Sequence, residues 1–389
     1  MKILRLNNIS DAVYQYLPEP AYTHLTQCED PDAILVRSAD MNAMELPANL
    51  LAIGRAGVGV NNIPIDRCTK AGIAVFNTPG ANANAVKELV LCGMLLSGRD
   101  VIGGIAWAQS LRGQSDVQKR VEKGKSQFVG PELLGKRLGV IGLGAIGVMV
   151  ANAAHALSMD VLGYDPFISV ESAWGLSRAI ERAGSLEQVL TRCDYVTIHV
   201  PLLSETRGMM NADAFAQMKE GAVLLNFSRD ALVDETALLA ALDSGRLRRY
   251  VTDFPTEALL GHKRVIAIPH LGASTPESEE NCAAMAAREL HDYLTDGTIA
   301  NSVNLPACSM ARSGATRVAV IHRNIKNMVG QITSRLAGRG HNIANMVNRS
   351  RGEIAYTLLD LDEEPNGDGG RNLINELDTI EGVLRVRVL

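Results

Sequence analysis

The chain alternates short apolar runs with stretches of helical periodicity, beginning near its N-terminus. Each early apolar run ends in glycine, asparagine or a charged residue, and residues 83–98 have the composition of a buried helix. Strands that alternate with helices are typical of parallel sheets, because their crossover connections are helical. The pattern predicts a first parallel sheet with strands at residues 2–6, 33–37, 50–57 and 73–77.

A second series of the same kind begins at Leu138. Helical stretches separate its strands, and a longer helical stretch follows at residues 275–296. The series predicts a second parallel sheet. The strands expected after the one at Leu138 are residues 161–165, 195–200, 222–227 and 265–270.

The last part of the chain changes character. Residues 301–316 are rich in serine, proline and small side chains, which predicts a linker. Apolar and helical stretches then follow in the order strand, helix, strand, strand, helix, strand, which is typical of a ferredoxin-like unit. The strands are expected at residues 317–324, 341–350, 353–362 and 383–389, with helices at 329–338 and 372–378.

Composition narrows the class of protein. With 47% hydrophobic and 21% charged residues the chain is typical of globular proteins, and a net charge of −5 argues against a nucleic-acid partner. The six cysteines are scattered, without the spacings of a metal site, which favours free thiols in a reducing compartment. No signal peptide opens the chain, and the apolar run at residues 85–96 is too short to span a bilayer. We therefore expect a cytoplasmic protein without a metal or a membrane partner.

A dinucleotide-binding signature follows the strand at Leu138. Gly142, Gly144 and Gly147 have the spacing G-x-G-x-x-G between an apolar strand and a helical stretch, and the next strand ends in Asp165. The first glycine permits a tight turn, the second lets a pyrophosphate approach the backbone, and the third lets helix and strand pack closely. Asp165 would accept the ribose hydroxyls and repel a 2′-phosphate, so the sequence predicts NAD rather than NADP.

Three side chains at or beyond strand ends could transfer a proton alongside a hydride. His270 could accept the proton of a hydroxyl group, Glu257 could stabilise the imidazolium, and Arg229 could bind a substrate carboxylate through its guanidinium fork. Each has an ordinary alternative: a hydrogen-bonded histidine, a solvated loop acid and a surface cation. Their succession after strands of one nucleotide-binding sheet favours the catalytic interpretation.

These motifs resemble those of the D-isomer-specific 2-hydroxyacid dehydrogenases. The matching stretches, in chain order, are VRSA (36–39), GRAGVGVNNI (54–63), GVIGLGAIG (139–147), YDP (164–166), HVPL (199–202), NFSRDALVDE (226–235) and PHLGAST (269–275). Within that family the chain resembles the members that oxidise 3-phospho-D-glycerate to 3-phosphohydroxypyruvate with NAD, the first step of L-serine biosynthesis. The last part resembles an ACT regulatory domain.

The resemblance implies an α/β architecture of two Rossmann-like doubly wound parallel-sheet domains and a ferredoxin-like βαββαβ domain. The implied substrate-binding domain comprises residues 1–93 with 276–301, and the NAD-binding domain residues 94–275. Residues 302–316 are the linker and residues 317–389 the ACT domain. The resemblance also implies a homo-oligomer, a homodimer or homotetramer.

Residue roles follow from the same resemblance. Arg229, Glu257 and His270 are implied as the catalytic residues. The implied cofactor-binding residues are Gly142, Gly144, Ala145, Ile146, Gly147, Asp165, Pro201, Phe227, Ser228, Asp253, Gly272 and Ala273. The matching substrate-domain loops give Arg37, Ser38, Arg55, Val58 and Gly59 as implied substrate-binding residues. By their charge, Arg37, Arg55 and Lys125 are candidates for the substrate phosphate, although Arg55 could instead form a loop salt bridge. L-serine is implied as a feedback effector bound by His322, Asn324 and Asn342.

Two alternative functions stay open. A hydroxypyruvate or glyoxylate reductase would use the same fold on a substrate without phosphate, and an NAD-sensing regulator would keep the fold without turnover. The last domain could also serve only for dimerisation. The chain departs from the family pattern around Asp253 and Glu257, which stand one residue closer together than usual, and at Asp230, where glycine usually follows the arginine.

Overall fold

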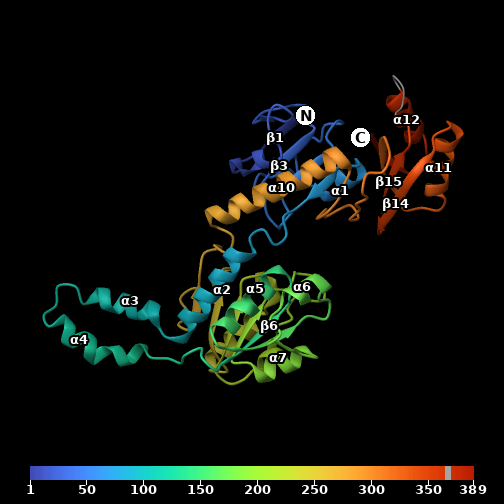
Figure 1. The fold of residues 1–389 in the computed structure, drawn as a ribbon. Coiled ribbons are helices and arrows are strands. Elements are labelled where there is room, and N and C mark those ends of the chain that lie inside the picture. The colour runs from blue at the N-terminus through green and yellow to red at the C-terminus, as the bar shows by residue number, and fades with distance from the viewer. Residues whose placement is uncertain (364–368) are drawn as a thin grey trace. The chain divides into compact units, whose positions relative to one another are not determined.

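The computed structural model describes residues 1–363 and 369–389, which form two compact units. Unit 1 comprises Met1–Ala81 and Pro276–Leu389, and unit 2 comprises Asn82–Thr275. The chain thus leaves unit 1 for unit 2 and returns to it, and both units contain sheets with helices packed against them (Figure 1).

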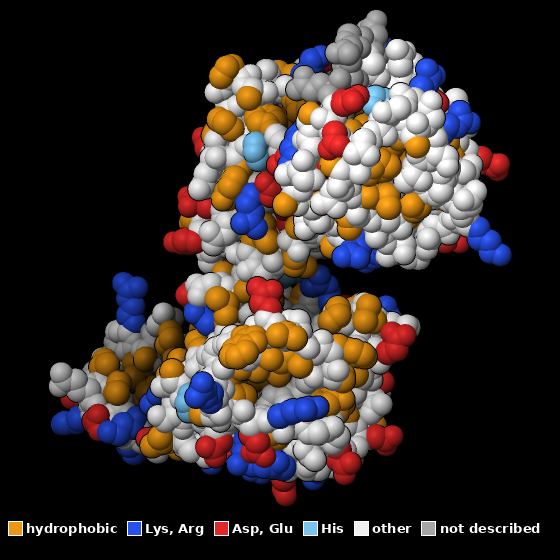
Figure 2. Space-filling view, turned by 45° about the vertical axis from the view of Figure 1, so that its right-hand side comes forward, with side chains coloured by type: hydrophobic (Ala, Val, Ile, Leu, Met, Phe, Trp, Pro, Cys, Tyr) orange, Lys and Arg blue, Asp and Glu red, His pale blue; other side chains and the backbone are white. Residues whose placement is uncertain are grey.

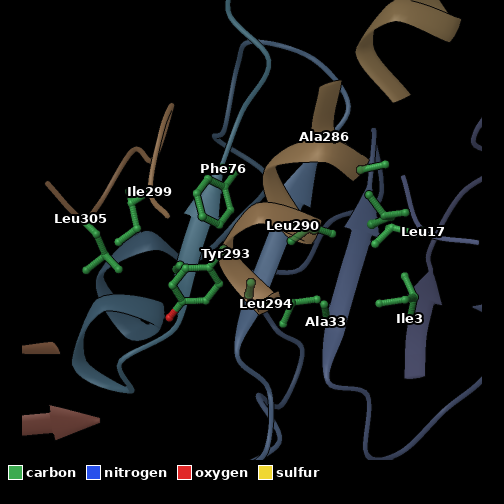
Figure 3. Close-up of a cluster of buried hydrophobic side chains, with 14 of the residues drawn as sticks. Ile3, Leu17, Ala33, Phe76, Ala286, Leu290, Tyr293, Leu294, Ile299 and Leu305 are labelled. Atoms are coloured by element: carbon green, nitrogen blue, oxygen red, sulfur yellow. The ribbon is translucent and has the colours of Figure 1, made fainter. Parts of the chain in front are cut away.

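The parallel sheet of unit 1 has the order β2-β1-β3-β4-β5 over the described residues. Helix α10 (Pro276–Asp296) and the 3-10 helix η1 (Asp11–Gln15) contribute to the hydrophobic core on one face, and α1 (Ile65–Lys70) to that on the other. Leu290 and Tyr293 of α10 point at the sheet, where Tyr293 lies against Phe76 (Figure 3). The strands are β1 (Lys2–Arg5), β2 (Thr23–Leu25), β3 (Ala33–Val36), β4 (Ala52–Arg55) and β5 (Ala74–Phe76).

The parallel sheet of unit 2 has the order β12-β11-β10-β9-β6-β7-β8 within the described chain. Helices α2 (Ala83–Gly98) and α5 (Ala145–Ala156) pack on one face, while α7 (Leu186–Arg192), α8 (Ala212–Gln217) and α9 (Glu235–Asp243) pack on the other. The short helix α6 (Val170–Gly175) follows β7. The strands are β6 (Arg137–Ile141), β7 (Asp160–Tyr164), β8 (Glu181–Arg182), β9 (Tyr195–Ile198), β10 (Ala222–Asn226), β11 (Leu247–Thr252) and β12 (Val265–Ala267).

The predicted domain boundary after residue 93 would divide helix α2. In the structure α2 belongs entirely to unit 2, because Val86, Val90 and Met94 join the core formed by β6, β10 and β11. The chain therefore passes from unit 1 to unit 2 just before this helix, between Ala81 and Asn82.

Helices α3 (Val101–Ser110) and α4 (Val117–Gly124), followed by the 3-10 helix η2 (Lys125–Phe128), form an arm that projects from the sheet of unit 2 (Figure 1). No described residue of α3 or α4 is buried, and Ile102 and Ile105 are about half exposed at 48% and 54%. Apolar and basic side chains lie together on the arm, at the lower left of Figure 2. Among the described residues no single helix is long and apolar enough to cross a membrane, although the bent pair α2–α3 meets that test by length and composition.

The last part of unit 1 is the predicted βαββαβ unit. Its antiparallel sheet has the order β14-β15-β13-β16 over the described residues, with α11 (Met328–Gly338) and α12 (Gly369–Asp378) in the core on one side. This confirms the ferredoxin-like architecture, while the identification as an ACT domain stays a prediction. The strands are β13 (Thr316–Arg323), β14 (Ile343–Arg351), β15 (Ile354–Leu361) and β16 (Val383–Val388).

The first half of the stretch predicted as a linker, residues 302–316, packs against the sheet of unit 1. Ser302, Asn304, Leu305 and Cys308 are buried, and Asn304 accepts a hydrogen bond from the amide of Val75 at 2.9 Å. Its small polar residues satisfy backbone groups at the edge of the sheet.

The other face of the βαββαβ sheet is continuous with the core of unit 1. Ala319, Ile321, Tyr356 and Leu358 belong to the same buried cluster as helix α10. Arginines close the contact with the C-terminal end of that helix: Arg387 donates to the carbonyl groups of Tyr293 and Leu294, and Arg317 to that of Asp296. Leu294 and Asp296 belong to the last turn, whose carbonyl groups lack intrahelical partners, and cations stabilise that end of a helix.

We predict that the buried ion pair of Arg317 and Asp360 is required for the stability of unit 1. Both side chains are at most 1% exposed, with Nε–Oδ1 at 2.7 Å. Burial alone would raise the pKa of Asp360, but the hydrogen bonds from Arg317 and the Ser313 amide outweigh it and hold the pKa below its usual value. Asp360→Asn leaves an uncompensated buried guanidinium and should lower the free energy of unfolding by about 3–5 kcal/mol.

The measurement is urea denaturation, with Asp30→Asn as the matched control. Asp30 forms an exposed pair with Lys2 in the same unit, in which the two side chains are 64% and 48% exposed, so its loss should have little effect. Equal destabilisation by both substitutions would contradict the prediction.

Candidate active site

The turn between β6 and α5 uses its three glycines in three different ways. Gly142 has φ of +90°, and a Cβ atom there would lie 2.6 Å from the carbonyl oxygen of His199. A Cβ atom at Gly147 would lie 1.9 Å from the carbonyl oxygen of Gly142, so α5 can start beside β6 only without a side chain at this position. Around Gly144, the residue that precedes the helix, a Cβ atom would meet no described atom within 4 Å.

This geometry fits a dinucleotide. The open space at Gly144 adjoins the N-terminus of α5, whose unpaired amides and dipole favour a pyrophosphate. Asp165 follows β7 and is anchored at the same turn: its Oδ2 accepts the amide of Leu143 at 2.9 Å and its Oδ1 accepts that of Phe167 at 2.8 Å. Each carboxylate oxygen retains a lone pair, which a ribose hydroxyl could use.

Arg229 is presented by a hydrogen-bonded turn at the end of β10. The side chain of Asn226 donates to the carbonyl group of Arg229 at 2.7 Å and accepts the amide of Ser228, and the Ser228 hydroxyl donates to the carbonyl group of Ile198. The guanidinium of Arg229 stays exposed, with Nη1 donating to the carbonyl group of Ser228. The backbone is therefore fixed while most of the guanidinium donors remain available for a ligand.

A buried carboxyl group lies between the end of β11 and the loop after β12. Asp253 is 1% exposed, and its Oδ2 accepts the amide of Gly272 at 3.2 Å. Burial raises the pKa of Asp253, while the nearby charges of His270 and Arg229 act in the opposite direction. Its Oδ1 has no hydrogen-bond partner among the described residues, which is unusual for a buried oxygen and fits a site that completes its contacts with a ligand.

His270 and Glu257, the predicted proton-transfer pair, do not touch in this structure. The imidazole of His270 packs on the ring of Phe254, with centroids 4.6 Å apart. Both His270 and Glu257 are exposed, and no hydrogen bond or ion pair joins them in the described part of the chain. The sheet brings Arg229, Asp253 and His270 to one edge, and it leaves Glu257 on the neighbouring loop.

The other implied cofactor residues belong to the same unit. Pro201 follows β9, where its carbonyl group accepts the hydroxyl of Thr206. Phe227 is buried in the core that α2 joins. Lys125, the substrate-binding candidate of this unit, lies on the arm and pairs with Glu122 at 2.5 Å. The remaining implied contacts, Ala145 and Ile146 at the start of α5 and Gly272 and Ala273 after β12, lie at the carboxyl ends of strands, where open α/β sheets bind ligands.

The implied substrate residues of unit 1 lie on two loops after neighbouring strands. Arg37 and Ser38 follow β3, and the guanidinium of Arg37 contacts Oε1 of Glu279 in the first turn of α10 at 2.7 Å. Arg55 is the last residue of β4, and its guanidinium lies over Gly57 in the loop that follows, where any Cβ atom would overlap it. Val58 is 37% exposed, and Gly59 follows it on the same loop.

The three implied effector residues do not lie together in one chain. His322 and Asn324 are at one end of the βαββαβ sheet, where His322 pairs with Ala355. Asn342 precedes Ile343, which pairs with Leu361 at the opposite end. His322 is also buried, and Thr357 and the carbonyl group of Arg323 contact its two ring nitrogens.

Two polar residues of this edge were missed by the sequence interpretation. Asn226 is fully buried and holds the Arg229 turn, and a polar residue closing the apolar run AVLLN was a visible sign of it. His199 follows β9 beside Gly142, and burial lowers its pKa to about 3, so its imidazole is neutral at pH 7. No local pattern indicated that this histidine would be partly buried.

We predict that alanine substitutions at two of the glycines have opposite consequences. Gly147→Ala places a methyl group against the backbone of Gly142 and should lower the free energy of unfolding by about 3 kcal/mol. Gly144→Ala should leave stability nearly unchanged, because its φ of −74° suits alanine, while weakening NAD binding at least about tenfold. Thermal unfolding and calorimetric NAD titration measure the two effects, and full NAD affinity in Gly144→Ala would contradict the assignment of this space to the cofactor.

Comparisons with known proteins agree with this geometry. A family model described as D-isomer specific 2-hydroxyacid dehydrogenase, NAD binding domain, matches residues 105–272. The D-3-phosphoglycerate dehydrogenase of Haemophilus influenzae is 33% identical over 358 residues, which cover 89% of this chain and 83% of that protein. The human D-3-phosphoglycerate dehydrogenase is 36% identical over 307 residues, and this chain spans only 54% of its length.

A solved structure gives the same result for the fold. NAD+-bound 3-phosphoglycerate dehydrogenase of Entamoeba histolytica superposes with a TM-score of 0.61 at 26% identity, covering 78% of this chain and 98% of that one. The prediction of NAD as the cofactor is confirmed by the matching domain and by this NAD-bound structure. The chain belongs to the family of D-isomer-specific 2-hydroxyacid dehydrogenases, and its unit 2 contains the NAD-binding domain of that family.

Proposed function

We propose that the protein oxidises 3-phospho-D-glycerate to 3-phosphohydroxypyruvate with NAD. The observation that carries the proposal is that Arg229, Asp253 and His270 lie together at the cofactor edge of unit 2. The charges of Arg229 and His270 both act on the buried carboxyl group of Asp253. Hydride transfer from a 2-hydroxy acid requires a proton acceptor, a carboxylate-binding cation and a dinucleotide within one site.

NAD, when bound, would supply the hydride acceptor. His270 accepts the proton of the substrate hydroxyl group in its neutral form, and its exposed ring can reach a ligand. Arg229 binds the substrate carboxylate with two parallel hydrogen bonds, a geometry that a lysine lacks. Arg229 thereby orients the carbon that loses the hydride.

A carboxylate that stabilises the His270 imidazolium is part of the proposal. Glu257 is our first candidate, by resemblance, and its loop would have to move for the two side chains to meet. Asp253 is the second candidate, and the influence of His270 on its pKa supports it. Both candidates are kept because Asp253 and Glu257 stand closer together in the sequence than is usual in the family.

The phosphate of the substrate is assigned to Arg37 and Arg55, cations on neighbouring loops of unit 1. Similarity to several D-3-phosphoglycerate dehydrogenases supports this substrate over an unphosphorylated one. A hydroxypyruvate or glyoxylate reductase and a non-catalytic NAD sensor remain the alternatives to be tested.

The test follows NADH absorbance with 3-phospho-D-glycerate, D-lactate and glycerate side by side. We expect the phosphorylated acid to have the highest kcat/KM, and His270→Asn to lower kcat by about a hundredfold or more with NAD affinity within a few fold. His155→Asn, an exposed histidine of α5, is the matched control and should have no effect.

Two outcomes would contradict the proposal in different ways. A preference for an unphosphorylated acid would favour the reductase alternative. NAD binding without turnover of any of the acids would favour the sensor.

We also propose an oligomer that binds L-serine. Strand β14 is a long edge strand with most of its residues exposed, and such edges pair readily. Antiparallel pairing of two β14 strands about a two-fold axis near Val347 would bring Asn342 of a second copy beside Gly352. Asn324 donates to the carbonyl group of Gly352 at 3.0 Å, so an amino acid could then contact both asparagines.

Point variants test the effector proposal better than a truncated chain, because the last domain shares its core with the rest of unit 1. Asn324→Ala and Asn342→Ala should each abolish serine binding measured by calorimetry, whereas Asn372→Ala on the exposed face of α12 should not. Mixing the two inactive variants should restore part of the binding, because a mixed dimer has one intact site. Failure of the mixture to bind serine would refute a site shared between copies.

A further inference from the structure

The sheet order of unit 1 singles out one loop. In the order β2-β1-β3-β4-β5 the chain passes from β1 to β2 on one side and then from β2 to β3 on the other side of β1, so the carboxyl ends of β1 and β3 flank a topological switch point. Open α/β sheets bind ligands at such points. The loop after β3, residues 37–39, carries Arg37 and Ser38, and the segment after β1 carries Asn7.

Asn7 holds the amide side of this loop. Its Oδ1 accepts the amides of Arg37 at 2.9 Å, Ser38 at 2.9 Å and Ala39 at 3.1 Å. Three successive amides that converge on one oxygen form a small concave nest, a backbone shape that normally surrounds an anion. Here a neutral carboxamide from the neighbouring strand fills it.

Asn62 holds the carbonyl side of the same loop. Its Nδ2 donates to the carbonyl groups of Ala39 at 2.8 Å and Arg37 at 3.5 Å. The backbone carbonyl group of Asn62 accepts the amide of Met41 at 2.8 Å, which fixes the chain just after the loop. Asn7 therefore accepts from the amides of all three loop residues, and its Nδ2 also lies 3.5 Å from the Ser38 hydroxyl, whereas Asn62 donates to the carbonyl groups of two of them.

We propose that Asn7 and Asn62 are positioning residues that set the substrate loop at residues 37–39, an inference that rests on the proposed function. Neither needs to touch the substrate. The two carboxamides fix the loop backbone. The guanidinium of Arg37, which contacts the Glu279 carboxylate, can therefore exchange that carboxylate for the substrate phosphate by rotation of its side chain alone. Loss of either clamp lets the loop sample orientations that do not bind substrate, which reduces the competent fraction and raises KM.

The same substitution at both positions separates the two roles. Asn7→Asp keeps the acceptor oxygen and should leave KM for 3-phospho-D-glycerate within about threefold, whereas Asn62→Asp replaces a donor with a carboxylate facing carbonyl oxygens and should raise KM about tenfold or more. Both variants add the same charge near the loop, so a general effect of charge would shift both alike. Asn7→Ala removes the acceptor and should resemble Asn62→Asp, with kcat little changed in each.

Two controls accompany these variants. Asn8→Asp adds the charge at the adjacent exposed residue and should have no effect on KM. NAD affinity should stay at the wild-type value in every variant, because the cofactor residues are in unit 2.

Hydrogen–deuterium exchange gives a readout that does not depend on any substrate. The amides of residues 37–39 should exchange faster in Asn7→Ala and at the wild-type rate in Asn7→Asp, while the buried strand β3 keeps its protection and reports an intact fold. If no acid is turned over, the exchange result still tests the clamp, so failure of the proposed function is distinguishable from failure of this inference.

The inference is overturned if Asn7→Asp and Asn62→Asp raise KM equally, or if Asn7→Ala leaves both KM and loop exchange unchanged. Faster loop exchange in Asn7→Ala with an unaltered KM would also overturn it, since the clamp would then have no bearing on substrate binding.

Discussion

The candidate site depends on one close contact, the approach of helix α5 to strand β6 at Gly147. A side chain there would collide with the carbonyl oxygen of Gly142, so the missing Cβ atom allows the helix to begin directly at the strand end. Its N-terminal amides then open onto the space around Gly144, and Asp165 is tied to the same turn through the Leu143 amide. The parallel strands to one side deliver Arg229, Asp253 and His270 to the same edge, because the carboxyl ends of parallel strands all meet there.

In unit 1 the carboxyl ends of the parallel strands also meet at one edge, but different residues shape the loops there. Its sheet offers a switch point where two asparagines, rather than glycines and a helix terminus, shape the loop for an anionic group. The βαββαβ sheet is also part of this unit, since Tyr356 and Leu358 lie in the core behind α10 and arginines bind the C-terminal carbonyl groups of that helix.

Much of the fold and of the cofactor turn was predictable, because both depend on local sequence patterns. The spacing of Gly142, Gly144 and Gly147 indicates a turn, an open space and a close contact, and the structure has all three. The βαββαβ order at the end of the chain follows from alternating periodicity. By contrast, the packing of Asn304 against β5 depends on residues far away in the sequence, so the composition of the stretch did not indicate it.

Other features of the candidate sites depend on strand register and loop geometry, which the sequence alone does not indicate. Whether Asn342 lies near His322 depends on how β14 and β13 align with β15, and the alignment separates them. Asn7 carries no motif, and its role appears only when three amides of a loop about 30 residues away converge on it. The one-residue shortening between Asp253 and Glu257 is visible in the sequence, but its effect on the reach of Glu257 is a matter of loop geometry.

A crystal structure of the protein with bound NAD tests the central claim most directly. We predict pyrophosphate oxygens within hydrogen-bonding distance of the amides at the start of α5, the adenosine ribose on the carboxylate of Asp165, and the nicotinamide at the edge that carries Asp253 and His270. A dinucleotide that lies elsewhere on unit 2, or whose ribose does not contact Asp165, would contradict the account.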